Sequence, residues 1–243
     1  MRRILQALDI RAGGWTITWV IFRYLPRCEK IIMKSPFFFL FVLILGGYPF
    51  FIKKGRAQTA RIGNTTWMSM NLSVDTFRNG DKILEASTAE AWKKAGEAGQ
   101  PAWCWAITGD SLAQQRAGRL YNWFAVSDPR KLAPRGWRIP TDSLYIEMMN
   151  QLGGQRAAGL QLKAVGAWTE KLTSKLTDFS AFPTGFINAD GERIGYRRYA
   201  YWWTSNESNA LVAWYRGLRY LDDELITGGN RKETGYSVRC VRE

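Results

Sequence analysis

The sequence predicts an α+β domain, and three observations lead to that class. Two segments carry the capping and spacing pattern of short helices, whereas most of the remaining chain has the pattern of short strands separated by glycine-containing turns. The helices and strands do not alternate regularly, which argues against a doubly wound parallel sheet. With 46% apolar residues, the 243-residue chain can also bury a sizeable core. We therefore expect two short helices, antiparallel sheets and many loops.

Both helices are predicted from their ends. Ser87 is spaced to cap the first helix, which Gly99 ends. Thr141 can cap the second helix, in which an apolar residue recurs at every fourth position from Leu144, and Gly153 ends it. Each helix is short, so its apolar side must pack on a neighbouring element.

Strands are predicted where β-branched and aromatic residues gather between turn residues. These segments lie near residues 61–70, 102–107, 199–203, 210–221 and 235–243. Three of the five fall in the last third of the chain, so we expect antiparallel sheets there.

The N-terminal part differs in composition from the rest. Residues 35–52 are uncharged and largely apolar, but glycine and proline interrupt the run, so it resembles the core of a signal peptide more than a full membrane span. We interpret 33–57 as a signal peptide or an uncleaved membrane anchor, and 1–32 as a non-native or disordered extension. Residues 58–243 then form one exported domain, extracellular or in the cell envelope, with a membrane contact only through 35–52 if that segment is retained.

Charge and residue types exclude several functions. The net charge is +13, but residues 1–57 hold ten basic and two acidic residues, and the remaining basic residues are scattered among acidic ones. We therefore expect no nucleic-acid binding. The absence of histidine removes Ser-His-Asp and Cys-His catalysis. Cys28, Cys104 and Cys240 lack zinc-site spacing, so no metal is expected from cysteine.

Long motifs in the exported part resemble a known family. They read GNTTWMSMNL, TFRNGD, PAWCW, GRLYNWFAVSDPRKLAPRGWRIPTD, FSAFPTGF, YWWTSNES and GYSVRCVRE, in that order. Their order and spacing are similar to those of the Fibrobacter succinogenes major paralogous domain, over about residues 61–243.

The resemblance implies a bacterial secreted or envelope domain with a C-type-lectin-like fold, related to formylglycine-generating enzymes. It also implies that the N- and C-terminal strands of the domain pair. The enzyme relatives use two closely spaced cysteines near the C-terminus, and Cys240 has no such neighbour. The resemblance therefore implies no oxidase activity, and we expect a non-enzymatic domain.

Aromatic residues raise the question of a binding surface. Trp67, Trp123, Trp137 and Trp168 lie in the motifs and are interpreted as core residues. The stretch 202–230 mixes aromatic and polar residues, the composition of recognition surfaces. Nine residues are predicted to contact a ligand on one exposed face: Trp202, Asn206, Glu207, Trp214, Arg216, Arg219, Tyr220, Asp222 and Asn230. Tyr215 lies in the same stretch, and a plain exposed sheet face is the alternative.

Consecutive carboxylates at Asp222, Asp223 and Glu224 offer a second interpretation. With Glu207 they could supply oxygen ligands for calcium or the acids of a glycan hydrolase. The sequence favours a solvated acidic turn over both, because neighbouring residues of a strand point to opposite faces.

Export would place Cys104 and Cys240 in an oxidising compartment, so we expect a disulfide between them. The alternative is two buried thiols that pack as small apolar residues.

Together these features predict a binding module for a glycan or a protein ligand at the cell surface, with no cofactor. A glycan hydrolase and a purely structural surface module are the alternatives.

Overall fold

A computed structural model describes residues 7–12, 15–20, 59–169 and 177–243, and the chain divides into two compact units, Met1–Lys54 and Gly55–Glu243. In the first unit, β1 (Ala7–Ala12) and β2 (Trp15–Val20) form an antiparallel hairpin. The signal or anchor segment 33–57 lies outside the described residues. Within the described ranges, no helix is long and apolar enough to cross a membrane.

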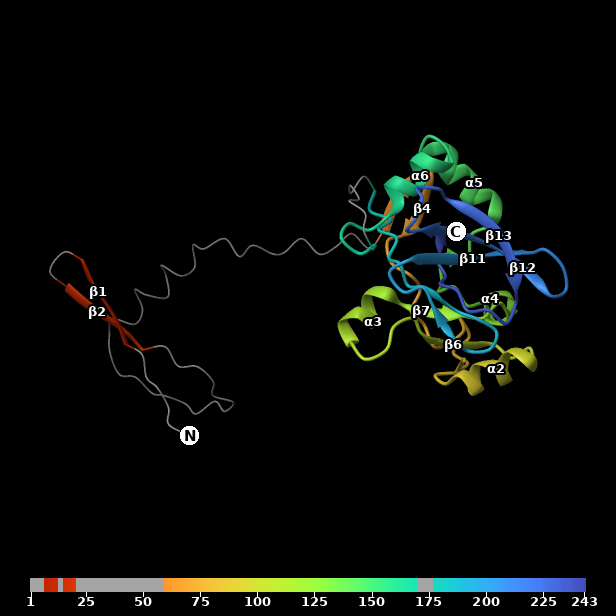
Figure 1. Ribbon diagram of the computed structural model, residues 1–243, viewed down its shortest axis with the longest axis horizontal. Helices are drawn as coiled ribbons and strands as arrows, with labels where there is room; N and C mark the ends of the chain where they lie inside the picture. The colour runs from red at the N-terminus through yellow and green to blue at the C-terminus, as the bar shows by residue number, and fades with distance from the viewer. Residues whose placement is uncertain (1–6, 13–14, 21–58, 170–176) are drawn as a thin grey trace. The chain divides into compact units, whose positions relative to one another are not determined.

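The second unit is an α+β domain, as expected (Figure 1). Its described part contains five helices rather than the two predicted: α2 (Ala89–Glu97), α3 (Ser111–Ala117), α4 (Trp123–Ser127), α5 (Asp142–Gln151) and α6 (Gln155–Leu162). The additional helices are short, which explains why apolar periodicity did not reveal them. The first predicted helix is present as α2, but Thr88 rather than Ser87 caps it, by accepting a hydrogen bond from the Ala91 amide.

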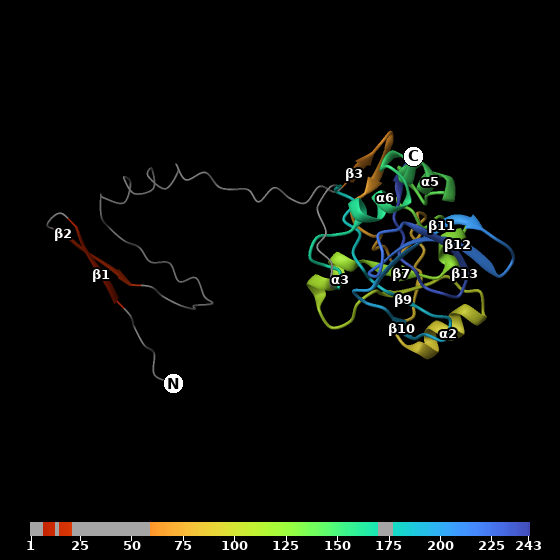
Figure 2. The same cartoon turned by 45° about the horizontal axis from the view of Figure 1, so that its top comes forward.

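One sheet joins the two ends of the domain. It has the order β3 (Thr59–Ile62), β4 (Thr65–Met68), β14 (Val241–Arg242) and β8 (Trp137–Arg138), and all pairs are antiparallel. The C-terminus therefore lies beside the β3–β4 hairpin (Figure 2). This arrangement confirms that the N- and C-terminal strands of the domain pair.

Three further sheets complete the domain. They are β5 (Leu84–Glu85), β6 (Ala102–Trp105) and β7 (Arg119–Tyr121); β9 (Phe186–Ile187) with β10 (Arg193–Ile194); and β11 (Tyr199–Glu207), β12 (Val212–Arg219) and β13 (Ile226–Arg231). All strand pairs in them are antiparallel except β5 with β6.

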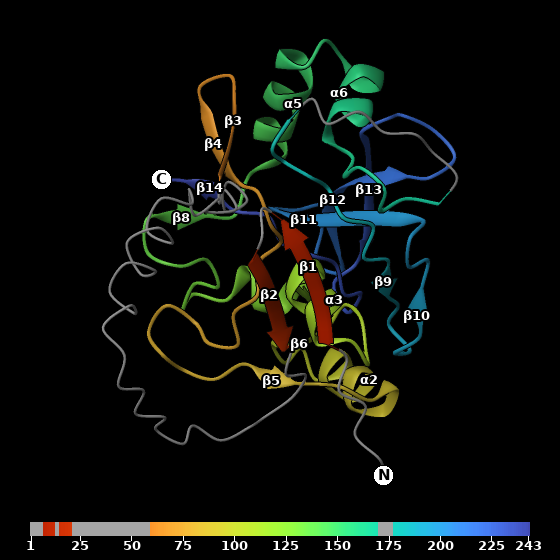
Figure 3. The same cartoon turned by 90° about the vertical axis from the view of Figure 1, so that its left-hand side faces the viewer.

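The β11–β12–β13 sheet lies between two apolar clusters. Figure 3 shows α5 and α6 together on one side of this sheet. On one face, Trp202 and Leu218 pack with Tyr145 of α5 and with α6. On the other face, Trp203 packs with Tyr236 and with α4. Successive strand residues point to opposite faces, so even-numbered residues of β11 and of the paired part of β12 face α5. The sheet is thus covered on both faces over much of its length.

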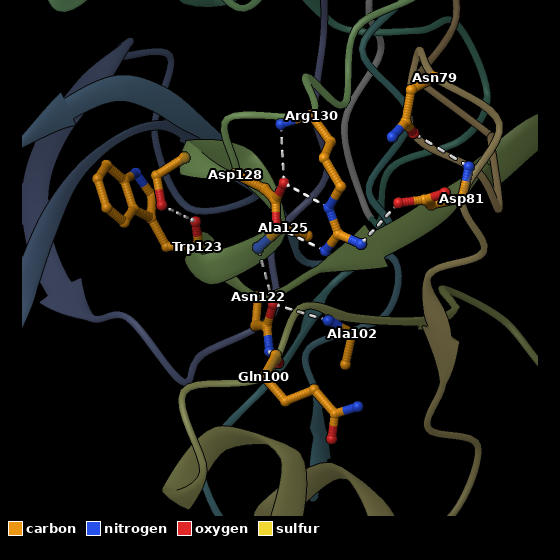
Figure 4. A network of polar contacts seen from close by, with 10 residues as sticks. Asn79, Asp81, Gln100, Ala102, Asn122, Trp123, Ala125, Asp128 and Arg130 are labelled. Atoms are coloured by element: carbon orange, nitrogen blue, oxygen red, sulfur yellow. Dashed lines mark hydrogen bonds and ion pairs between the residues drawn. The ribbon is translucent and has the colours of Figure 1, made fainter.

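Polar side chains anchor the loops around this core (Figure 4). Arg130 forms hydrogen bonds of 2.9 and 2.8 Å with Asp128 and of 3.2 Å with Asp81. The Arg130 guanidinium therefore lowers the pKa of Asp128. Asn122 Oδ1 accepts from the Ala102 and Ala125 amides, which caps α4 and ties it to β6.

A buried polar network lies between the sheets. Asn71 Oδ1 accepts hydrogen bonds from Trp202 Nε1 at 2.9 Å and from Arg239 Nη2 at 2.7 Å. Asn71 Nδ2 donates to Ser237 Oγ at 3.2 Å, and Arg239 Nη1 donates to the Phe179 carbonyl at 2.6 Å. These buried groups satisfy one another across segments that are far apart in sequence.

The predicted disulfide is wrong. Cys104 and Cys240 are both unbridged and buried, and they belong to different apolar clusters. Burial raises the pKa of Cys104 to about 11 and that of Cys240 to about 12. Both thiols pack as small apolar residues, which is the alternative that the sequence left open.

Candidate binding surface

Two of the nine predicted contact residues belong to the interior, so that part of the prediction is wrong. Trp202 is 0% exposed and donates its indole N–H to Asn71. Arg216 is 5% exposed and forms two hydrogen bonds of 2.7 Å with the Asp142 carboxylate at the start of α5. Both side chains lie on the sheet face that α5 covers.

Most of the other polar residues of the set have partners within the protein. Asn206 Oδ1 accepts from the Asp142 amide at 2.8 Å. Glu207 pairs with Lys232 at 2.6 Å, and Arg219 pairs with Asp222 at 2.7 Å. Asn230 donates to Tyr236 Oη at 2.7 Å. These contacts stabilise the fold, so the nine residues do not form one open contact patch.

The two remaining members lie at the surface in different settings. Trp214 is 37% exposed and belongs to the α5 side of β12. Tyr220 is half-buried, with the Arg198 guanidinium 5.4 Å from its ring centroid. Of the nine side chains, Trp214 is the large aromatic group most accessible to a partner.

The run Asp222, Asp223 and Glu224 does not converge on a cation. Asp222 pairs with Arg219, Asp223 lies 3.3 Å from Lys163 Nζ, and Glu224 accepts from Gln155 at 3.3 Å. Across the described residues, no group of three or more His, Cys, Asp or Glu side chains could hold a metal ion. The carboxylates thus serve as partners for neighbouring side chains, which argues against the calcium interpretation.

An aromatic surface lies on the other face of the same sheet. We define the tyrosine face as Phe186, Tyr199, Tyr201 and Tyr215. Tyr199 and Tyr201 stack with ring centroids 5.5 Å apart and an interplanar angle of 13°, and Tyr201 lies 5.1 Å from Tyr215. Phe186 of β9 adds a ring 5.6 Å from Tyr201. Tyr201 is 9% exposed and the other three are half-buried, so their outer edges reach solvent.

Glycines give these rings their positions. A Cβ atom on Gly217 would overlap the Tyr201 ring, and one on Gly195 would overlap the Tyr199 ring. A Cβ atom on Gly228 would lie 2.6 Å from Tyr215 Oη. Each tyrosine ring therefore packs directly against a glycine, in space that any other side chain would fill.

The hydroxyl groups of Tyr201 and Tyr215 stay neutral at physiological pH. Burial raises the pKa of Tyr201, and the neighbouring Tyr215 and Tyr199 hydroxyls raise it further. Burial also raises the pKa of Tyr215. Neutral phenols both donate and accept hydrogen bonds, and the Arg219–Asp222 pair lies close enough to affect them.

Tyr215 belongs to the stretch with the composition of a recognition surface but is not among the nine predicted contact residues, and neither are Phe186, Tyr199 and Tyr201. The spacing of Tyr199 and Tyr201 indicates that they share one strand face. The glycines opposite them provide a second signal, visible once the strand register is known.

Comparison with known proteins identifies a single family. A family model described as the Fibrobacter succinogenes major domain matches residues 60–242. Neither a curated protein nor a solved structure matches the chain.

Proposed function

The chain belongs to the Fibrobacter succinogenes major domain family, and we propose that this member is a non-enzymatic binding domain that recognises a glycan through the tyrosine face. The domain acts outside the cell or in the cell envelope, as the apolar segment at 35–52 suggests. The pairing of its terminal strands supports a C-type-lectin-like arrangement.

The observation that carries the proposal is the set of tyrosine rings fixed against glycines. Sugar rings combine apolar C–H faces with hydroxyl groups, and tyrosine offers an apolar ring with a polar tip. Rigid aromatic side chains lose little conformational entropy on binding, so they are efficient contact groups. The hydroxyl groups of Tyr199, Tyr201 and Tyr215 supply hydrogen bonds at the edge of the same surface.

The contacts of the candidate acids support binding rather than glycan hydrolysis. A hydrolase needs a free acid beside the scissile bond. The carboxylates that the sequence offered for this role are instead paired within the protein: Glu207 with Lys232, Asp222 with Arg219 and Asp223 with Lys163.

A purely structural module is the second candidate. Its support comes from residues 202–232, where most polar side chains already have partners within the protein. This candidate differs from the first in one respect, since it requires no ligand at the tyrosine face.

Neighbouring residues on β12 provide a matched test. Tyr215 lies on the tyrosine face, whereas Trp214 lies on the opposite side of the strand. On a glycan array, we expect the protein to bind at least one glycan. Tyr215→Ala should weaken its binding about tenfold or more, the loss expected for an aromatic anchor. Trp214→Ala should leave the affinity within about twofold, and both should keep the native circular dichroism spectrum.

Chelation of calcium should not change the affinity, because the nearby carboxylates are paired within the protein. Equal losses in the two variants would place the ligand elsewhere. Absence of binding to every glycan would favour the structural module.

A further inference from the structure

A pocket of about 290 Å³ opens beside the tyrosine face. Its walls include Ile107, Phe186, Ile194 and Tyr196, and Arg193 and Thr108 add polar groups. We propose that this pocket binds a carboxylate-bearing sugar unit, a uronate, of the glycan. The inference rests on the proposed function and names the class of glycan.

The pocket is continuous with the tyrosine face through Phe186, which lines the pocket and also contacts Tyr199 and Tyr201. Its volume lies at the lower end of the range for small-ligand sites, about 300–1,000 Å³, and fits a single sugar unit. Tyr196 is 48% exposed and presents a ring to such a unit. One glycan chain can therefore place neighbouring units on the tyrosine face and in the pocket.

Arg193 supplies the cation. Its Nη1 donates to the Trp105 and Ala106 carbonyls, which fix the guanidinium at the pocket rim. Arg193 forms no ion pair with a carboxylate among the described residues. The guanidinium has further N–H groups, and its planar geometry suits a carboxylate.

The surrounding charges favour an anion. Arg116 lies 5.7 Å from the ring of Phe182, which is 6.4 Å from Tyr196. Arg116 forms no ion pair among the described residues either. The acidic residue that precedes Arg193 in the chain, Glu192, accepts a hydrogen bond from Asn188 at 3.0 Å. Unpaired arginines around an apolar pocket complement a ligand that has an apolar ring and a negative charge.

Methyl esterification provides a matched ligand pair. Polygalacturonate and alginate would each be compared with its own methyl ester, by isothermal titration calorimetry on the full chain. We expect at least one acidic polymer to bind tenfold or more tightly than its ester. The preference should decrease as salt concentration rises, since ions screen exposed charges.

Two arginine variants then separate a specific contact from general charge. Arg193→Gln should remove most of the preference for the acid over the ester. Arg138→Gln removes the same charge from an exposed position on β8, in another sheet, and should leave the preference intact. Equal loss in the two variants would overturn the proposal.

Other outcomes distinguish this inference from the proposed function. If acid and ester bind equally, or if only neutral or sulfated glycans bind, the uronate site is refuted and glycan binding stands. If an acidic peptide binds at Arg193 and no glycan does, both are refuted. If no glycan binds in any form, both also fail.

Discussion

Two fully buried tyrosines differ in what their hydroxyl groups contact. Tyr121 Oη accepts from the Val74 amide at 2.8 Å and donates to the Val74 carbonyl at 2.7 Å. Tyr145 Oη has no hydrogen-bond partner among the described residues. We expect Tyr121→Phe to lower the free energy of unfolding by about 1–3 kcal/mol, because it leaves buried backbone groups unsatisfied. Tyr145→Phe should change it by less than about 0.5 kcal/mol or raise it.

Urea denaturation of the two variants measures this difference, and each variant is the control for the other because both keep the aromatic ring. A comparable loss for Tyr145→Phe would mean that an ordered water or another acceptor satisfies its hydroxyl. Such a water would belong to the core structure.

Buried residues also explain why the family is recognisable while its function is not. Asn71, Trp202, Ser237 and Arg239 come from three of the motifs that carry the resemblance, and they meet in one hydrogen-bonded network. These motifs identify the scaffold. Of the tyrosine face, Phe186 and Tyr201 lie in the motifs, whereas Tyr199 and Tyr215 lie outside them, so motif matching alone could indicate only part of that face.

At the level of elements, the start of α5 depends on a distant strand. Thr141 occupies the capping position, but its side chain makes no capping hydrogen bond. Asn206 of β11 instead accepts from the Asp142 amide at 2.8 Å. We expect Asn206→Ala to lower the free energy of unfolding by about 1 kcal/mol, the usual contribution of a cap.

Thr141→Ala is the control and should cost less than about 0.5 kcal/mol, as is usual at surface sites. Thermal or urea denaturation measures both changes. The reverse order of effects would show that the threonine caps the helix in solution.

The sequence predicted α2 and α5 because turn residues and apolar spacing are local signals. It could not predict that Asn206 caps α5, because 64 positions separate Asn206 from Asp142. It could not predict the very short strands β9 and β10 either, because they contain two residues each and their pairing depends on the whole fold.

For the whole molecule, the main uncertainty in the sequence was which sheet face lies open. Alternation along the strands correctly puts Trp202 and Arg216 on one face and Tyr201 and Tyr215 on the other. It does not show which face a helix covers. Because α5 packs on the first face, Trp202 and Arg216 of the predicted site are buried, and the opposite face provides the candidate surface.

The reactivity of the two buried thiols measures how readily the folded domain opens. Cys104 and Cys240 are 0% exposed in separate clusters, and burial raises both thiol pKa values. A thiol reacts as its thiolate, so neither should react at pH 8 with a disulfide reagent while the domain is folded. In a Cys28→Ser variant, we expect two thiols to react in denaturant without reductant. In the native protein, opening of the domain should limit the rate at which these thiols react.

A reductant should leave the denaturation midpoint of the same variant unchanged, because no bridge is present to break. A disulfide would instead close a long loop and contribute about 3–5 kcal/mol to stability, which a reductant would abolish. Fewer than two reactive thiols in the denatured, unreduced protein would contradict the structure. Fast reaction of the native protein would show that one thiol's cluster opens without the other, so that the two clusters do not unfold as one unit.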